Sequence, residues 1–422
     1  MKFAIFINGL GYGGTEKAAC RWARGLKARG HEVTLLSLAD GPRRAELEQA
    51  GVSLKILRAD AAEIAGALRS ISPHAIHVHA AGQAVSEDPL GDALALLPQK
   101  IPVVQTNVFG RLENPREDAW TDFRLFISWS NCVQAARRSF RRLDEQFFRR
   151  NSVAVYPLDP DDGPSAAAVA DFRAAHGIGP DEIVFGHLAR PDPIRWDHQP
   201  IAAFHRAVRQ NRRVKFLLRE PPPEIARSLK QGPDAGRFLI LPATTDAAEL
   251  RLTTAAMDVV FHYSKVGETF GYGVAEPMNL GKPAIVNSVP WQGQGQLELA
   301  RHGECGFVAN SAAAMTRAIL ALAGDAALRE RMGAQGRRHV RVLADPESSL
   351  NRLEAILQAA IEKRDSPFAA ADARRARETA AWLDAHQFGH SWLEQIRLRP
   401  FYYRVRFHEL RKYLAGNWAK KR

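Results

Sequence analysis

The chain has 422 residues, of which 46% are hydrophobic and 25% are charged, a globular composition with enough material for two domains. Its net charge of +12 favours acidic partners such as nucleotide diphosphates, anionic lipid head groups or nucleic acid. No run reaches the roughly 18 apolar residues that cross a membrane, so no transmembrane span is predicted.

The N-terminus and the cysteines indicate the compartment. Residues 1–7 are too short for a signal peptide and lack a small-residue cleavage site, so they predict a first strand. Cys20, Cys132 and Cys305 are far apart and lack metal-ligand spacing, which suits a reducing cytoplasm. We therefore expect a cytoplasmic protein, with peripheral attachment to the inner face of the cell membrane as an option.

The first elements predict a Rossmann-like unit. A strand at residues 3–7 leads through the glycine-rich turn 8–16 into a helix, and a second strand follows at 32–38. The glycines do not fit the spacing G-x-G-x-x-G, and no acidic residue closes the second strand before Asp40. These features favour a looser anion- or sugar-contacting loop over a dinucleotide site. A plain tight turn at Gly13 and Gly14 is the alternative.

Polar side chains end two later strands of this half. His79 ends the strand predicted at 75–79, and Asn107 ends the strand at 101–107. Ligands usually contact α/β sheets at such strand ends, although a lone strand histidine is more often structural. Further strands are expected at 54–57, 125–128 and 153–157. Arg137, Arg138, Arg141 and Arg142 are assigned to the solvated face of a basic helix.

A Pro-, Asp- and Gly-rich stretch at 158–165 marks the domain boundary. The sequence predicts a first α/β domain at 1–158, a linker at 159–181, a second α/β domain at 182–345 and a C-terminal extension at 346–422. In the second domain, Arg190 and Arg195 follow the strand predicted at 182–188. Guanidinium groups match phosphate oxygens well, and a simple surface charge is the alternative.

The stretch 266–290 carries the strongest functional pattern. Gly271 and Gly273 allow the backbone to approach a ligand, and a helix beginning there presents free N–H groups and a partial positive charge, which suit a phosphate. Glu268 and Glu276 offer acceptors for sugar or ribose hydroxyls. The alternative is an ordinary helix with acidic residues near its N-terminus and a glycine C-cap at Gly281.

Glu268 and Glu276, separated by seven residues and followed by Gly281-Lys282-Pro283, resemble the donor-binding signature of the family 4 retaining glycosyltransferases of the GT-B fold. The resemblance covers about residues 1–345. It implies an α/β, GT-B architecture of two Rossmann-like domains facing across a cleft, with a C-terminal helical extension. It also implies retaining transfer of a sugar from a nucleotide-diphospho-sugar to a saccharide or lipid-linked acceptor, in bacterial cell-surface polysaccharide or lipopolysaccharide synthesis.

The same resemblance implies roles for individual residues. Glu268 would contact the donor sugar near its reacting carbon, Glu276 the ribose hydroxyls, and Arg190 and Arg195 the diphosphate. The full expected set is, for catalysis, Glu268, Arg190, Arg195 and His79; for donor binding, Gly13, Gly14, Phe270, Gly271, Tyr272 and Glu276; and on the acceptor side, Asn107. No Asp-x-Asp signature is present, so neither a metal nor another cofactor is expected.

Residues 397–422 interleave aromatic and basic side chains, which suits an anionic membrane surface; a packed helix with a solvated basic face is the alternative. No nucleic-acid module is recognisable, so no nucleic-acid partner is expected. Two other functions compete with sugar transfer. A phosphorylase- or epimerase-like GT-B enzyme is one. A phosphorylase would need a lysine that holds its cofactor, and no motif in the sequence indicates such a lysine. A catalytically weakened nucleotide- or glycan-binding module is the other, favoured by His187 and Asn107, where relatives usually carry Arg and His.

Overall fold

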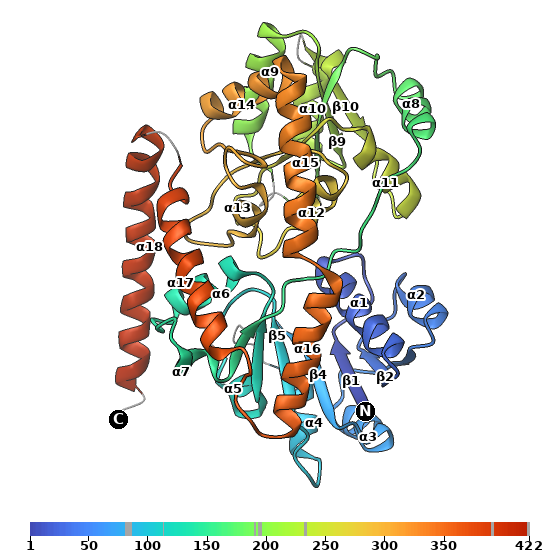
Figure 1. Cartoon of the computed structure of the whole chain (residues 1–422), viewed down its shortest axis with the longest axis vertical. Helices are drawn as coiled ribbons and strands as arrows, with labels where there is room; N and C mark the ends of the chain where they lie inside the picture. Colours follow the sequence, from blue (N-terminus) through green and yellow to red (C-terminus); the bar gives the residue numbers. More distant parts are fainter. Residues whose placement is uncertain are drawn as a thin grey trace. The chain divides into compact units, whose positions relative to one another are not determined.

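The computed structural model describes residues 1–80, 87–112, 114–189, 191–192, 196–231, 234–389 and 392–419 (Figure 1). The chain divides into two compact units, and each is described separately. Unit 1 comprises Met1–Pro157 and Ala344–Ala381, and unit 2 comprises Leu158–Leu343 and Trp382–Arg422. Within the described residues, no helix combines the length and the apolar character that crossing a membrane requires.

Unit 1 is built on a parallel seven-stranded sheet with the strand order β3-β2-β1-β4-β5-β6-β7. Its strands are β1 Lys2–Ile7, β2 Glu32–Ser37, β3 Ser53–Ile56, β4 Ala75–Ala80, β5 Val103–Asn107, β6 Phe123–Phe126 and β7 Asn151–Val153. Its helices are α1 Gly14–Ala28, α2 Arg44–Gln49, α3 Ala61–Ile71, α4 Pro89–Ala95, α5 Pro115–Trp120, α6 Trp129–Arg138, α7 Glu145–Phe148, α16 Pro346–Ile361 and most of α17 Ala369–His386.

The central strands of unit 1 are buried on both faces because helices cover the sheet, so β1 reads as a nearly continuous apolar run, whereas β4 also carries the buried His77 and His79. Helix starts follow from capping side chains: Asp60 accepts from the N–H of Glu63 at 2.8 Å, and Ser128 accepts from that of Asn131 at 3.1 Å. The sequence analysis assigned Arg137, Arg138, Arg141 and Arg142 to one basic helix, but the described residues do not contain such a helix. α6 ends at Arg138, and Phe140 adopts a left-handed conformation with φ 52°.

α16 and α17 return to unit 1 from the far end of the chain, and α16 packs against α1, β4, β5 and β6 (Figure 1). The indole Nε1 of Trp22 donates to Ser349 Oγ at 3.1 Å, and both side chains are buried. Asp372 accepts from Ser152 Oγ at 2.6 Å and pairs with Arg352. Burial raises the pKa of Asp372, so the Arg352 guanidinium is needed beside its carboxylate.

Unit 2 contains a parallel six-stranded sheet with the strand order β10-β9-β8-β11-β12-β13. Its strands are β8 Ile183–Leu188, β9 Val214–Arg219, β10 Phe238–Leu241, β11 Val259–His262, β12 Ala284–Val286 and β13 Gly306–Val308. Its helices are α8 Ala166–Ala175, α9 His198–Gln210, α10 Pro223–Gln231, the 3-10 helix η2 Ala235–Arg237, α11 Ala247–Ala256, α12 Tyr272–Asn279, α13 Gly295–Ala300, α14 Ala312–Gly324, α15 Ala326–Leu343 and α18 Trp392–Ala419.

α8 lies inside the segment that the sequence analysis assigned to a linker. Ser165 caps it by accepting from the N–H of Ala168 at 3.2 Å, and the alanine-rich run that follows favours helix. Phe172 is buried in the cluster that contains Met257, and Arg173 pairs with Asp258 at 3.2 Å. These contacts make α8 part of the core of unit 2. The turn-rich composition at 158–165 ends before this helix begins.

Candidate active site

The strand order of unit 2 places a topological switch point between β8 and β11. β8 pairs with both β9 and β11, so the connections leave the sheet in opposite directions from the carboxyl ends of these two strands. Open α/β sheets bind ligands in the crevice at such a point. His187 and Leu188 end β8, and His262 ends β11. The segment after His262 carries the two glutamates.

The loop after β11 ends in a helix start that needs glycine. Gly271 is the N-cap of α12 and has φ 103°, a conformation that side chains disfavour. The first turn of α12 lies at the end of β8, because a Cβ added at Gly273 would lie 3.5 Å from the carbonyl oxygen of Leu188. The first turn of α12, with the positive end of the helix dipole, therefore lies at the switch point, in a position that suits an anion.

Glu268 is held at the same place from several sides. Its N–H donates to Gln296 Oε1 at 2.8 Å, and its carbonyl accepts from the N–H of Gly295 at 2.7 Å. The Nε2 atom of His262 lies 3.2 Å from Glu268 Oε1, at ion-pair distance but without hydrogen-bond geometry. The side chain of Glu268 is 16% exposed.

His262 and Gln296 are functional candidates that the sequence analysis did not single out. His262 was recognised only as part of a strand, and Gln296 only as part of a turn. Both are buried: His262 is 5% exposed and Gln296 is fully covered. The pairing of a strand-end histidine with a loop carboxylate becomes visible only when β11 and the loop are placed in space.

Glu276 and Tyr272 lie four residues apart on α12, so their side chains share one face of the helix. The ring of Tyr272 meets that of Phe270 edge to face, with 5.0 Å between the centroids. Arg190 and Arg195, which the sequence analysis assigned to the diphosphate, lie outside the described residues. His187 holds its imidazole toward the sheet, with Nδ1 2.9 Å from the carbonyl oxygen of Phe261.

A cavity of about 330 Å³ lies at the carboxyl ends of β11, β12 and β13 in unit 2. Its walls include the amides of Asn287 and Asn310 and the ring of Trp291. α18 contributes Phe401, whose ring meets that of Trp291 edge to face at 4.5 Å. Amides beside aromatic rings are the lining that polyhydroxylated ligands favour, because hydroxyls find partners and ring carbons find apolar faces.

In unit 1 the predicted residues lie at the corresponding switch point, between β1 and β4. Gly13 is the N-cap of α1, Gly14 is its exposed first residue, and the turn that carries them follows β1. His79 lies one residue before the end of β4. Its neighbour across the sheet is Thr106, and Ala80 pairs with Asn107. The sheet therefore brings the ends of β1, β4 and β5 to one edge.

His79 is 5% exposed and packs its ring against His77 at 4.7 Å and against Trp22 at 5.5 Å. Burial lowers the pKa of His79 well below its usual range, and the neighbouring His77 lowers it further. The imidazole is therefore neutral at pH 7. Neither ring nitrogen of His79 has a hydrogen-bond partner within the described part of the chain, which leaves one donor and one acceptor for a ligand.

Asn107 is fully buried, and its side chain closes the loop that follows β5. Its Nδ2 donates to the carbonyl of Arg111 at 2.5 Å, and its Oδ1 accepts from the N–H of Arg111 at 3.1 Å. The amide thus already has a donor and an acceptor contact. Across the described ranges, no group of three or more His, Cys, Asp or Glu side chains is arranged to hold a metal ion.

Two family models match the chain. Residues 13–189 match the "Glycosyl transferase 4-like domain", and residues 239–339 match "Glycosyl transferases group 1". The chain belongs to the group 1 glycosyltransferases of the GT-B type. The predicted α/β, GT-B fold is thereby confirmed, and the protein is a glycosyltransferase. No curated protein matches it significantly.

Solved structures similar to this glycosyltransferase share its fold at low sequence identity. HepE from Anabaena, in complex with UDP and glucose, is 17% identical with a TM-score of 0.67; the match covers 85% of this chain and 100% of HepE. A glycosyltransferase from Rickettsia africae is 14% identical with a TM-score of 0.69, and the match covers 86% of this chain and 99% of that protein. WaaG, a glycosyltransferase involved in lipopolysaccharide biosynthesis, is 12% identical with a TM-score of 0.60. The match covers 83% of this chain and 98% of WaaG.

Proposed function

We propose that this glycosyltransferase moves a sugar from a nucleotide-diphospho-sugar to a saccharide or lipid-linked acceptor with retention of anomeric configuration, in cell-surface polysaccharide or lipopolysaccharide synthesis. The observation that carries the proposal is the start of α12: a glycine-capped helix end at the switch point of unit 2, with Glu268 fixed beside it and Glu276 further along the same helix. The UDP-glucose complex of HepE, which has this fold, supports a nucleotide-sugar donor.

The donor diphosphate would bind at the N–H groups that follow Gly271. Glycosyl transfer builds negative charge on the leaving phosphate, and fixed N–H dipoles stabilise that charge without having to reorganise. In this proposal Arg190 and Arg195 add guanidinium contacts. Glu276 accepts hydrogen bonds from the ribose hydroxyls, and Phe270 and Tyr272 line the path between ribose and sugar.

Glu268 would face the transferred sugar near its reacting carbon. Its backbone is tied to Gln296, and the Nε2 atom of His262 lies 3.2 Å from one carboxylate oxygen, so the carboxylate is positioned to face the oxocarbenium-like sugar or its hydroxyls. In unit 1, Gly13 and Gly14 would contact the phosphates, and neutral His79 would hydrogen-bond the sugar or acceptor. Asn107 shapes the acceptor side through its loop. We propose that transfer proceeds without a bound metal or cofactor, which predicts that EDTA leaves the rate unchanged.

The experiment that tests donor binding is a thermal-shift panel of UDP, GDP, ADP, CMP and their sugar conjugates. A ligand that binds only the native state raises its melting temperature by mass action. We expect one diphosphate and its sugar conjugate to shift the transition. If none of them shifts it, nucleotide-sugar binding by the free protein is contradicted.

Glu268→Gln then separates transfer from mere binding. It keeps the size of the side chain and removes its charge, so we expect kcat to fall by about 100-fold or more while the nucleotide shift is retained. Glu304→Gln is a matched control, because Glu304 is an exposed glutamate of the same unit. Turnover unaffected by Glu268→Gln would favour a binding module.

We also propose peripheral membrane attachment through α18. Ile396, Tyr403 and Phe407 are 60%, 59% and 64% exposed, and their spacing of seven and four residues places them on one helix face. Exposed Arg404 adds positive charge for anionic head groups. Co-sedimentation with phosphatidylglycerol vesicles should weaken in a Tyr403→Ser, Phe407→Ser variant. It should persist in Val342→Ser, a control side chain that is 80% exposed on α15. Equal binding by both variants would contradict the proposal.

A further inference from the structure

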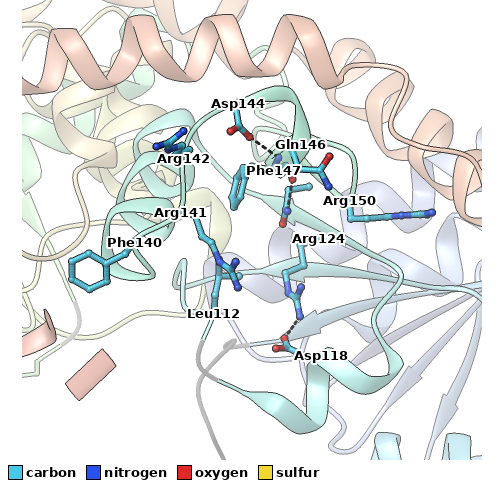
Figure 2. A pocket seen from close by; sticks show the side chains of 11 residues that line it. Leu112, Asp118, Arg124, Phe140, Arg141, Arg142, Asp144, Gln146, Phe147 and Arg150 are labelled. Atoms are coloured by element: carbon cyan, nitrogen blue, oxygen red, sulfur yellow. Dashed lines mark hydrogen bonds and ion pairs between the residues drawn. The ribbon is translucent and has the colours of Figure 1, made fainter. Parts of the chain in front are cut away.

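Unit 1 contains a cavity of about 460 Å³ that shares no residue with the candidate active site. It lies between the loop that follows α6, the short helix α7 and the beginnings of β6 and β7 (Figure 2). Its described lining includes four arginines, Arg124, Arg141, Arg142 and Arg150, and two aspartates, Asp118 and Asp144. The cavity is larger than a single inorganic anion requires, and its size is typical of small-molecule sites.

The positive charge of this lining is only partly compensated. Arg124 pairs with Asp118, and Arg150 lies 3.7 Å from Asp365. Asp144 accepts from the N–H of Phe147 at 3.0 Å and so caps α7. Within the described part of the chain, neither Arg141 nor Arg142 has an ion-pair or hydrogen-bond partner for its guanidinium group. Two cations therefore border the cavity without an ion-pair partner among the described residues.

The arginines also face one another. Figure 2 shows the guanidinium groups of Arg141 and Arg124 reaching into the same space from different elements, above Leu112. The Arg124 side chain is 18% exposed; burial lowers its pKa, and the nearby charge of Arg141 lowers it further. Like charges held at close quarters destabilise the protein. An anion between them would turn this repulsion into two charge-assisted contacts.

The backbone that presents Arg141 is itself strained. α6 ends in a Schellman turn: the N–H of Phe140 donates to Arg137 O at 3.3 Å, and that of Arg141 donates to Ala136 O at 2.8 Å. The left-handed position of such a turn normally holds glycine, but here it holds Phe140, with φ 52°. Strain of this kind persists where the surrounding structure enforces it, and it is common at ligand sites. Here it aims the residues after α6 at the cavity.

We propose that this cavity binds a phosphorylated saccharide, with the phosphate between Arg141 and Arg124 and the sugar ring in the remaining space. Arg142 adds a third cation at the rim. Phe147 provides an apolar wall for the face of a sugar ring, and the amide of Gln146 provides a donor and an acceptor for hydroxyls. The inference stands independently of the proposed donor chemistry, because it uses none of the residues of the candidate active site.

The test is calorimetric titration of the full chain with methyl glucoside 6-phosphate, glucose 1-phosphate, inorganic phosphate and glucose. We expect saturable binding of a sugar phosphate, and at least tenfold weaker binding of it in Arg141→Gln, because a charge-assisted contact to phosphate is lost. The Arg141 guanidinium has no hydrogen bond or ion pair within the described residues, and its loss relieves repulsion with Arg124, so the melting temperature should not fall. Arg69→Gln is the control: it removes one exposed charge from α3 of the same unit.

The outcomes distinguish the sources of the ligand. In methyl glucoside 6-phosphate the anomeric carbon is blocked, as it is inside a glycan. Tighter binding of this compound therefore assigns the cavity to a phosphorylated glycan. Tighter binding of glucose 1-phosphate assigns it to a free sugar phosphate. The proposal is overturned if no sugar phosphate binds, if Arg141→Gln and Arg69→Gln behave alike, or if inorganic phosphate binds as tightly as the sugar phosphates.

Discussion

Gly293→Ala tests whether the position of Glu268 limits the rate of transfer. Gly293 belongs to the loop before α13, and its backbone lies against Glu268. A Cβ at Gly293 would lie 2.6 Å from the carbonyl carbon and oxygen of Glu268 and 3.1 Å from its nitrogen. Contacts under 3.0 Å are essentially never seen for Cβ atoms, and 3.0–3.4 Å is already tight. The backbone of Glu268 must therefore move by about 0.4 to 0.8 Å.

A misplacement of about 1 Å can cost about 100-fold in rate, so we expect Gly293→Ala to lower kcat about tenfold. The KM for the donor should change less, because the three atoms nearest to the added Cβ all belong to the backbone of Glu268 and none to the start of α12. Initial rates at varied donor concentration separate the two constants, once the thermal-shift panel has identified the donor. The nucleotide-induced shift should remain.

Gly324→Ala is the matched control for the added methyl group. Gly324 ends α14, and a Cβ there would meet no other atom within 4 Å. This variant should keep both kcat and the melting temperature. If Gly293→Ala also keeps its kcat, the position of Glu268 does not govern the chemistry and the role proposed for it fails. If both variants lose activity equally, the effect is not specific to the loop.

Three further predictions concern other parts of the chain. Glu276→Gln should raise the KM for the donor about tenfold, since a charged acceptor for the ribose is lost; an unchanged KM in initial-rate assays would exclude that contact. Burial lowers the pKa of His77 to about 3, so the unfolded chain binds a proton first as the pH falls below about 6.5. His77 alone should therefore lower folding stability by up to about 1.4 kcal/mol per pH unit from there, and His79 adds a similar contribution. His77→Gln should make the slope shallower in urea titrations; an equally steep slope would contradict this prediction. Asp372→Asn removes the counter-charge of the Arg352 guanidinium and should lower the free energy of unfolding by about 3 to 5 kcal/mol, whereas a loss below 1 kcal/mol would show that the ion pair contributes little.

The pattern of apolar residues along the sequence was sufficient to predict most of the strands and helices. β2 was predicted at 32–38 and runs from Glu32 to Ser37, because its apolar and β-branched residues stand between polar segments. The start of α12 was predicted from Gly271, whose left-handed conformation few other residues adopt. The carboxylate pair was found because its spacing is a local property of the chain. Composition alone misassigned α8, since the turn-rich segment before it resembles a linker in character.

The remaining parts of the site depend on contacts between distant residues. His262 reaches Glu268 only because β11 ends beside the loop, and Gln296 reaches the same residue from the first turn of α13. The burial of Asn107 and its two bonds to Arg111 could not be deduced from a strand pattern. Likewise, Arg141 was assigned to a helix face, because nothing local signals that a phenylalanine takes the left-handed position.

The return of α16 and α17 to unit 1 has a consequence for biosynthesis. Trp22 and Ser152 find their partners Ser349 and Asp372 only after the ribosome has made the whole of Leu158–Leu343. At 5–20 residues per second, this delay is on the order of 10 to 40 s. During that time the nascent first half exposes the surfaces that α16 later covers on β4 and β5. This glycosyltransferase should therefore engage chaperones during translation, and a fragment that ends at Pro157 should aggregate.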